Sequence, residues 1–168
     1  MAKPEYTVLG TNMPRMGGAE RVTGAGIYGI DLALPNALHG GILRSHHAHA
    51  RIVSIDTNEA RALPGVHTVV TAADAPDVKY GRSTMDRYIL AKDKVRYMGD
   101  PVAAVAAESP AMVKQALKKI KVVYEPLPVV VDPEEAMKPS APTLHEDVPL
   151  PANLPQDAQV KNVFSYTG

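Results

Sequence analysis

The sequence predicts an α/β fold, bordering on α+β, in which a mixed sheet has flanking helices and a proline-rich extended tail follows. Two observations indicate this class. Strand-like and helix-like patterns alternate along residues 38–138, as expected when a sheet and helices share one core. In addition, residues 102–124 read as a strand–helix–strand unit, for which a right-handed crossover is expected if the two strands are parallel.

The first third of the chain predicts a lead-in followed by two strands. Residues 1–37 are rich in Gly and Pro and show no regular period, so we expect an extended segment with turns at Gly17-Gly18 and Pro35-Asn36. Residues 38–44 are apolar enough for a buried strand. Residues 51–56 roughly alternate polar and apolar side chains, which is typical of a half-buried strand.

The middle of the chain predicts a helix, a strand and a loop. Thr57 can cap a short helix over residues 58–63, and Pro64-Gly65 ends it before a strand at residues 66–71. Thr71 and Asp74 have the spacing of a capping box, which indicates a brief turn. Residues 76–94 are polar and irregular, as in a surface loop.

The last regular elements are the best defined. Residues 101–107 are small and apolar, which suits a central strand covered on both faces. Ser109-Pro110 begins a helix over residues 110–120, because a capping hydroxyl followed by Pro is typical of a helix start. The apolar stripe of this helix comprises Val113, Ala116, Leu117 and Ile120. A strand at residues 121–124 follows, and Asp132-Pro133 begins another short helix.

Proline spacing sets the expected organisation of the chain. Five prolines between residues 139 and 155 interrupt any regular element, so we expect an extended tail that lies on a partner or is mobile. We therefore predict a lead-in at residues 1–12, a folded domain at 13–138 and an extended tail at 139–168.

Composition excludes several classes of function. The 18 basic and 18 acidic residues balance, which gives no bias toward nucleic acid or an anionic membrane. The chain has no Cys, which excludes disulfides, thiolate catalysis, iron–sulfur ligation and cysteine zinc sites within it. No secretory h-region and no apolar run of the ~20 residues needed to span a membrane is present. We expect a soluble cytoplasmic protein that binds neither nucleic acid nor membrane.

Histidines offer the one candidate metal site. His47 and His49 would point the same way on a strand, and imidazole is a common metal ligand. Further ligands would have to come from elsewhere in the chain, so the favoured interpretation is that these rings bond to backbone at a strand end or turn. No GxGxxG, GxxxxGK[ST] or GxSxG motif is present, so no phosphate loop or hydrolase nucleophile is predicted.

The stretch Gly99-Asp100-Pro101 has two interpretations. A plain turn into a buried strand is the favoured one, because Gly and Asp are common turn residues. The other is a turn that faces another domain, which makes Gly99 and Asp100 interface candidates. The charged run of Lys92, Asp93 and Lys94 is expected to be solvated.

Four blocks of sequence resemble one known family. They are RVTG at residues 21–24 with Tyr28 and Asp31, LRSHHAHARI at 43–52, AKDKVRYMGDPVA at 91–103, and VYEPLP at 123–128. In order and spacing they resemble the N-terminal hammerhead domain of the molybdenum-binding large subunit of the xanthine dehydrogenase/aldehyde oxidase family. Within the family, the sequence LAKDKVRYMGDPVAAVAA at residues 90–107 is most similar to the 4-hydroxybenzoyl-CoA reductase type. Arg44, in the second block, joins Gly99 and Asp100 as an interface candidate.

The resemblance implies a non-catalytic domain or split subunit of a molybdenum hydroxylase. The family hydroxylates heteroaromatic rings or aldehydes with water, or, in one branch, removes a hydroxyl reductively from an aromatic acyl-CoA. Its cofactor loops and catalytic glutamate lie outside the matching blocks, so no catalytic, cofactor-binding or metal residue is implied in this chain. The assembled enzyme would carry a molybdopterin cofactor, 2Fe–2S clusters and FAD. The implied partners are the remaining molybdenum-cofactor domain or subunit and an iron–sulfur subunit.

Two other functions stay open on the sequence alone. The chain could be a free-standing binding module that reuses the hammerhead fold, since fold does not fix function. It could also be a histidine metal enzyme built on His46, His47 and His49. A neighbouring reading frame for the remaining molybdenum domain would argue against the first, and substoichiometric metal in the pure protein against the second.

Overall fold

The computed structural model describes residues 8–82, 84–146, 148, 152 and 161–163. The chain divides into two units, Met1–Ala37 and Leu38–Gly168. Among the described residues, no helix has both the length and the apolar character needed to cross a lipid bilayer.

The described part of the first unit consists of two short helical pieces and connecting segments. The helix α1, Gly18–Thr23, lies between Gly17 and Gly24, which both have positive φ angles, and the 3-10 helix η1 spans Gly29–Asp31. The sequence predicted an extended segment here and missed both pieces, because each is too short to show a hydrophobic period. The predicted turn at Pro35-Asn36 is confirmed, with Asn36 at a φ of 60°.

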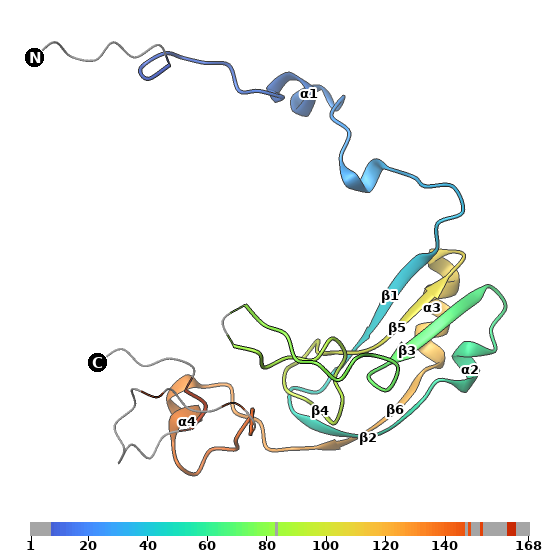
Figure 1. Cartoon of the computed structure of the whole chain (residues 1–168), viewed down its shortest axis with the longest axis vertical. Coiled ribbons are helices and arrows are strands. Elements are labelled where there is room, and N and C mark those ends of the chain that lie inside the picture. The colour runs from blue at the N-terminus through green and yellow to red at the C-terminus, as the bar shows by residue number, and fades with distance from the viewer. Residues whose placement is uncertain (1–7, 83, 147, 149–151, 153–160, 164–168) are drawn as a thin grey trace, which may run out of the picture. The chain divides into compact units, whose positions relative to one another are not determined.

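The second unit contains two three-stranded sheets instead of one mixed sheet (Figure 1). The first has the order β1-β5-β3, formed by β1 (His39–Arg44), β5 (Pro101–Ala107) and β3 (Val66–Thr71). All of its pairings are antiparallel. The central position of β5 confirms the prediction from its small apolar residues. β1 lies at an edge of this sheet and is only partly covered, so the expectation of a buried strand was wrong.

The second sheet has the order β4-β2-β6, formed by β4 (Lys94–Val95), β2 (Ala50–Asp56) and β6 (Lys121–Pro126). It too is antiparallel. The strand–helix–strand unit therefore carries the chain from β5 in one sheet to β6 in the other, and the rule for parallel crossovers does not apply to it. The fold class of mixed helices and strands is confirmed, whereas the mixed sheet is replaced by two antiparallel ones.

Helix α3, Pro110–Lys119, covers the first sheet with the predicted apolar stripe (Figure 1). The hydroxyl of Ser109 accepts a hydrogen bond from the Met112 amide, which confirms the predicted cap. Val113 and Ala116 are buried in the same core as Val69 and Val105. A second apolar cluster, comprising Ala50, Ala91, Val95 and Val102, joins the second sheet to β5.

The two shorter helices of this unit differ in how they are capped. Helix α2, Asn58–Arg61, follows Thr57, whose side chain does not cap it and instead accepts a hydrogen bond from Nε of Arg61. The backbone of Thr57, with φ −109° and ψ 1°, lies outside the extended region that is typical of a capping residue. Helix α4, Pro133–Met137, begins as predicted, because the Asp132 carboxylate accepts bonds from the Glu134 and Glu135 amides.

The predicted loop and tail are less exposed than their composition indicates. In the loop of residues 76–94, Leu90 and Ala91 are buried. In the tail, Ala141 is buried and residues 141–146, which we call the strap, contact the region around β4. Much of the tail lies outside the described residues, and the proposed boundaries at residues 12 and 138 stay predictions.

Candidate functional site

The three interface candidates of the sequence lie together at the connection from β4 to β5. We call residues 97–100 the Gly99 turn. Nη1 of Arg44 donates to the carbonyl oxygen of Gly99 at 2.9 Å. The amide of Ser45 donates to the carbonyl of Asp100, and the amide of Gly99 donates to the carbonyl of Ser45, at 2.9 and 2.8 Å. The end of β1 therefore fixes this turn through three bonds.

Gly99 is needed in this turn because of its backbone, and not because space is short. Its φ of 95° lies in a region that side chains rarely adopt, whereas a Cβ built at this position would have no heavy atom within 4 Å. The neighbouring Tyr97 and Met98 are 45% and 70% exposed, so the turn presents an apolar tip to its surroundings. The turn therefore exposes two large side chains on a backbone that β1 holds in place.

Asp100 is the half-buried ionisable group of the turn. Its Oδ2 accepts a hydrogen bond from the Arg96 amide at 3.0 Å. Burial raises the pKa of Asp100 above its usual value, although this amide and the charge of Arg96 act in the opposite direction. The carboxylate therefore destabilises the fold when it is charged. Asp100 also lines a small polar pocket of about 90 Å³, together with residues that include Asp86, Arg87, Tyr97 and His145.

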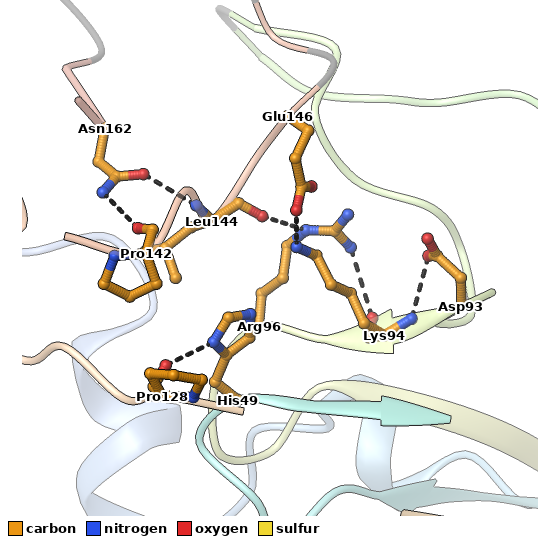
Figure 2. A network of polar contacts seen from close by, with 9 residues as sticks. All are labelled: His49, Asp93, Lys94, Arg96, Pro128, Pro142, Leu144, Glu146 and Asn162. Atoms are coloured by element: carbon orange, nitrogen blue, oxygen red, sulfur yellow. Dashed lines mark hydrogen bonds and ion pairs between the residues drawn. The ribbon is translucent and has the colours of Figure 1, made fainter. Parts of the chain in front are cut away.

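The strap is fastened to β4 and to the residue that follows it (Figure 2). Nζ of Lys94 binds the carboxylate of Glu146, and Nε of Arg96 donates to the carbonyl of Leu144 at 2.8 Å. Only 10% of the Lys94 side chain is exposed, against 61% of the Glu146 side chain. Burial raises the pKa of Glu146, but the hydrogen bond and charge of Lys94 outweigh it, and the net pKa lies below the usual value.

Asn162 joins the strap to α4, and Figure 2 shows its bonds to Pro142 and Leu144 of the strap. Its Oδ1 accepts from the Leu144 amide, and its Nδ2 donates to the carbonyls of Pro142 and Ala136, each at 2.9 Å. His145, in the strap, has its Nε2 4.0 Å from Asp86, while its Nδ1 is buried without a partner among the described residues. Burial, together with the charge of Arg96, lowers the pKa of His145.

His47 and His49 do not lie on a strand, so the strand geometry that would turn them the same way does not apply to them. Both are in the turn between β1 and β2. His49 is buried, and its Nδ1 lies 2.7 Å from the carbonyl oxygen of Pro128, in agreement with the structural interpretation. His47 packs on the rings of His46 and Tyr124, at centroid distances of 4.3 and 4.8 Å. In the part of the chain that the structure describes, no three His, Cys, Asp or Glu side chains are grouped to hold a metal ion.

Sequence reasoning missed Lys94, Arg96 and Asn162. Lys92 is exposed and pairs with Asp77, as expected of a solvated run, but Lys94 is buried and that part of the prediction was wrong. The reason is that Lys94 begins β4 and faces the strap, a contact across 52 positions that no local pattern reveals. The local signal in the sequence is the apolar Val95 directly after Lys94, and Val95 is fully buried in the structure.

Comparison with known proteins settles the family. Residues 23–128, more than half of the chain, match the family described as aldehyde oxidase and xanthine dehydrogenase, a/b hammerhead domain. The chain belongs to this family. The match covers the Gly99 turn, the histidine turn and both sheets, and it ends before the strap.

The relatives of this hammerhead chain are much longer proteins. The chain is 44% identical over 134 residues to a probable xanthine dehydrogenase subunit of Bacillus subtilis (strain 168), covering 79% of this chain and 18% of that one. It is 38% identical over 144 residues to the nicotinate dehydrogenase large molybdopterin subunit of Eubacterium barkeri, covering 85% and 34%. The structure resembles that of the reconstituted CO dehydrogenase from Oligotropha carboxidovorans, with a TM-score of 0.75, 43% identity and coverage of 82% and 18%. The chain therefore spans between about a fifth and a third of the length of these relatives.

Proposed function

We propose that this hammerhead chain supplies an assembly surface in the large subunit of a molybdenum hydroxylase and donates no group to the reaction. The observation that carries the proposal is the family match over residues 23–128 together with the use of its candidate residues. Arg44, Gly99 and Asp100 are engaged in fixing one turn whose apolar tip faces outward. Such residues shape a surface, and they leave the chemistry to other parts of the enzyme.

The proposal extends to the partners and cofactors of the assembled enzyme. The Gly99 turn would contact the remaining molybdenum-cofactor domain or subunit, and an iron–sulfur subunit would complete the complex. In that assembly the molybdopterin cofactor, 2Fe–2S clusters and FAD would be bound outside this chain. The substrate would be a heteroaromatic ring, an aldehyde or an aromatic acyl-CoA. The similarity of residues 90–107 to the 4-hydroxybenzoyl-CoA reductase type favours the aromatic acyl-CoA.

The experiment is a pull-down of the tagged full chain from its native cells, with identification of the proteins and metals recovered. We expect a molybdenum-containing polypeptide and an iron–sulfur protein. The variant Met98→Asp places a charge on the apolar tip of the turn and should reduce this recovery. Met85→Asp is the matched control, because Met85 is similarly exposed, at 64%, in the loop before β4.

Two results would contradict the proposal. Recovery of the chain alone, without metal, would leave a free-standing binding module. Equal recovery with Met98→Asp and with the unchanged chain would show that assembly does not use the Gly99 turn.

A further inference from the structure

His145 lies in the strap between two residues that cationic side chains hold. Nε of Arg96 donates to the carbonyl of Leu144 at 2.8 Å, and Nζ of Lys94 binds the carboxylate of Glu146 (Figure 2). The two cations come from β4 and from the second residue after Lys94. A positive charge on the imidazole of His145 would therefore be added where two positive charges already lie against the strap.

The contacts of the His145 ring suit its neutral form. Its Nδ1 is buried without a partner among the described residues, and its Nε2 lies 4.0 Å from Oδ2 of Asp86, which is too long for a hydrogen bond. A neutral imidazole has one N–H donor, whereas the protonated ring has two. Because a buried donor without an acceptor is unfavourable, protonation adds a second N–H that the closed strap does not satisfy.

Two cavities adjoin the ring, and the charged groups around them oppose protonation. The cavities, of about 310 and 90 Å³, are both lined by His145 and Asp86. The cationic side chains that line them or act on the charge of the ring are Lys79, Arg87, Lys94, Arg96 and Lys161. The acidic ones are Asp86, Asp100 and Glu146, and Tyr80, Tyr88 and Tyr97 line the smaller cavity. Burial, followed by the charge of Arg96, lowers the pKa of His145, whereas the charge of Asp86 raises it.

We propose that the strap is a pH-sensitive latch, which is closed while His145 is neutral and opens when His145 takes up a proton. The closed strap is most stable above the ordinary histidine pKa of 6.5, and its stability falls as the pH drops from there through the lowered folded pKa. Opening would break the contacts at Leu144 and Glu146 and expose the side chains of Lys94 and Arg96. Histidine is the side chain suited to such a switch, because its charge changes near neutral pH.

The test follows hydrogen exchange of the Leu144 amide in the full chain, because this amide donates to Oδ1 of Asn162 at 2.9 Å and is released when the strap opens. Exchange is measured between about pH 8 and about pH 5.5, above the range in which ordinary carboxylates titrate, and is corrected for the intrinsic rate at each pH. The opening constant should rise by more than about twofold on acidification, and should stay constant within about twofold in His145→Gln. His67→Gln is the matched control and should keep the rise, since His67 is half-exposed and lies on β3.

Two further variants separate the latch from its alternatives. Asp86→Asn removes the carboxylate that raises the pKa of His145, so the rise on acidification should become larger. Asp100→Asn removes the other carboxylate whose pKa burial raises toward this range, and should leave the rise unchanged. Thermal unfolding of each variant at the highest pH confirms that it folds, and Asp86→Asn tests the proposal even if His145→Gln does not fold.

Three results would overturn the latch. The opening constant of the unchanged chain might not depend on pH, or it could fall on acidification because the protonated ring pairs with Asp86 and tightens the strap. A rise that persists in His145→Gln would assign the dependence to another group. A rise that disappears in Asp100→Asn would assign it to the Gly99 turn.

Discussion

The guanidinium of Arg96 and the carbonyl of Leu144 are joined at 2.8 Å across 48 positions of the sequence. The same Arg96 donates its backbone amide to Asp100, whose carbonyl holds the amide of Ser45. One residue thus connects the strap to the Gly99 turn. The strap lies beyond the matched family region, so this contact links the family core to a segment outside it.

Replacing Arg96 by Ala should loosen the strap, whereas the backbone amide that binds Asp100 in the turn is kept. For Arg96→Ala we expect a loss of about 1–3 kcal/mol in the free energy of unfolding, because a partly buried charged hydrogen bond is lost and the Leu144 carbonyl loses its donor. Urea denaturation measures this loss, and hydrogen exchange at the Ser45 amide, which reports the turn, should be unchanged because the backbone bond to Asp100 remains. Lys114→Ala, on the exposed side of α3, is the control and should change stability by less than about 0.5 kcal/mol. A stability change no larger than that of Lys114→Ala would show that the Arg96 side chain does not hold the strap.

Removing Glu146 from its ion pair with Lys94 should change the stability of the chain more than removing Lys94. Glu146→Gln leaves the nearly buried ammonium of Lys94 without its carboxylate, whereas Lys94→Met leaves an already solvated carboxylate in water. We therefore expect the first variant to be the less stable, and the second to lie within about 1 kcal/mol of the unchanged chain. Chemical denaturation at pH 7 gives both values.

The same pair predicts a dependence on pH. Because the folded pKa of Glu146 is lowered, its contribution is present above the unfolded value and is lost as the pH falls through the folded one. The stability difference between the unchanged chain and Glu146→Gln should therefore shrink on acidification. If this stability difference stayed constant down to the pH at which the chain unfolds, it would not come from the ionised carboxylate of Glu146.

Local signals in the sequence predicted the elements that local chemistry determines. The cap at Ser109, the stripe around Val113 and the cap at Asp132 are confirmed because each depends on residues within one or two helical turns. The continuous apolar run of β5 likewise predicted a central strand, since a strand that is covered on both faces shows such a run.

What the sequence did not reveal depends on contacts between distant residues. The division into two sheets follows from the partners of β2, which pairs with β4 and β6, and no periodicity encodes that choice. In the sequence, Lys94 has the pattern of a solvated charge, but in the structure the strap covers it. Asn162 likewise has no distinctive sequence signal, although its side chain bonds to three backbone groups. Gly99 and Asp100 were singled out as turn residues and Arg44 from a matched block, but the bonds that join them depend on the contact between the end of β1 and the turn.

Asp100 should reduce the stability of the isolated chain at neutral pH. Its raised pKa means that the folded state binds the proton more tightly than the unfolded state, so stability falls as the pH rises from the ordinary aspartate pKa of 3.8 through the folded pKa. Asp100→Asn keeps an acceptor for the Arg96 amide and removes the charge. This variant should be at least as stable as the unchanged chain at pH 7 and should lack that slope, as measured by denaturation across pH. A less stable variant at pH 7 would show that the charge itself holds the turn.

Two adjacent glycines of β1 provide a matched test of the packing between the first sheet and α3. A Cβ added at Gly41 would overlap with Cγ1 of Val113 and come within 3.2 Å of Leu117, whereas a Cβ at Gly40 would meet nothing within 4 Å. Since Val113 is buried, it has little room to move. We expect Gly41→Ala to lower the free energy of unfolding by about 1–3 kcal/mol, and Gly40→Ala to leave it unchanged within about 0.5 kcal/mol.

Thermal and urea unfolding of the two variants, with the Val113 amide followed by hydrogen exchange, would locate the effect. Faster exchange at Val113 in Gly41→Ala alone would mark α3 as the element displaced. Equal loss of stability in both variants would instead indicate that β1 itself does not tolerate a side chain, and the close approach of β1 to α3 would then not be the cause.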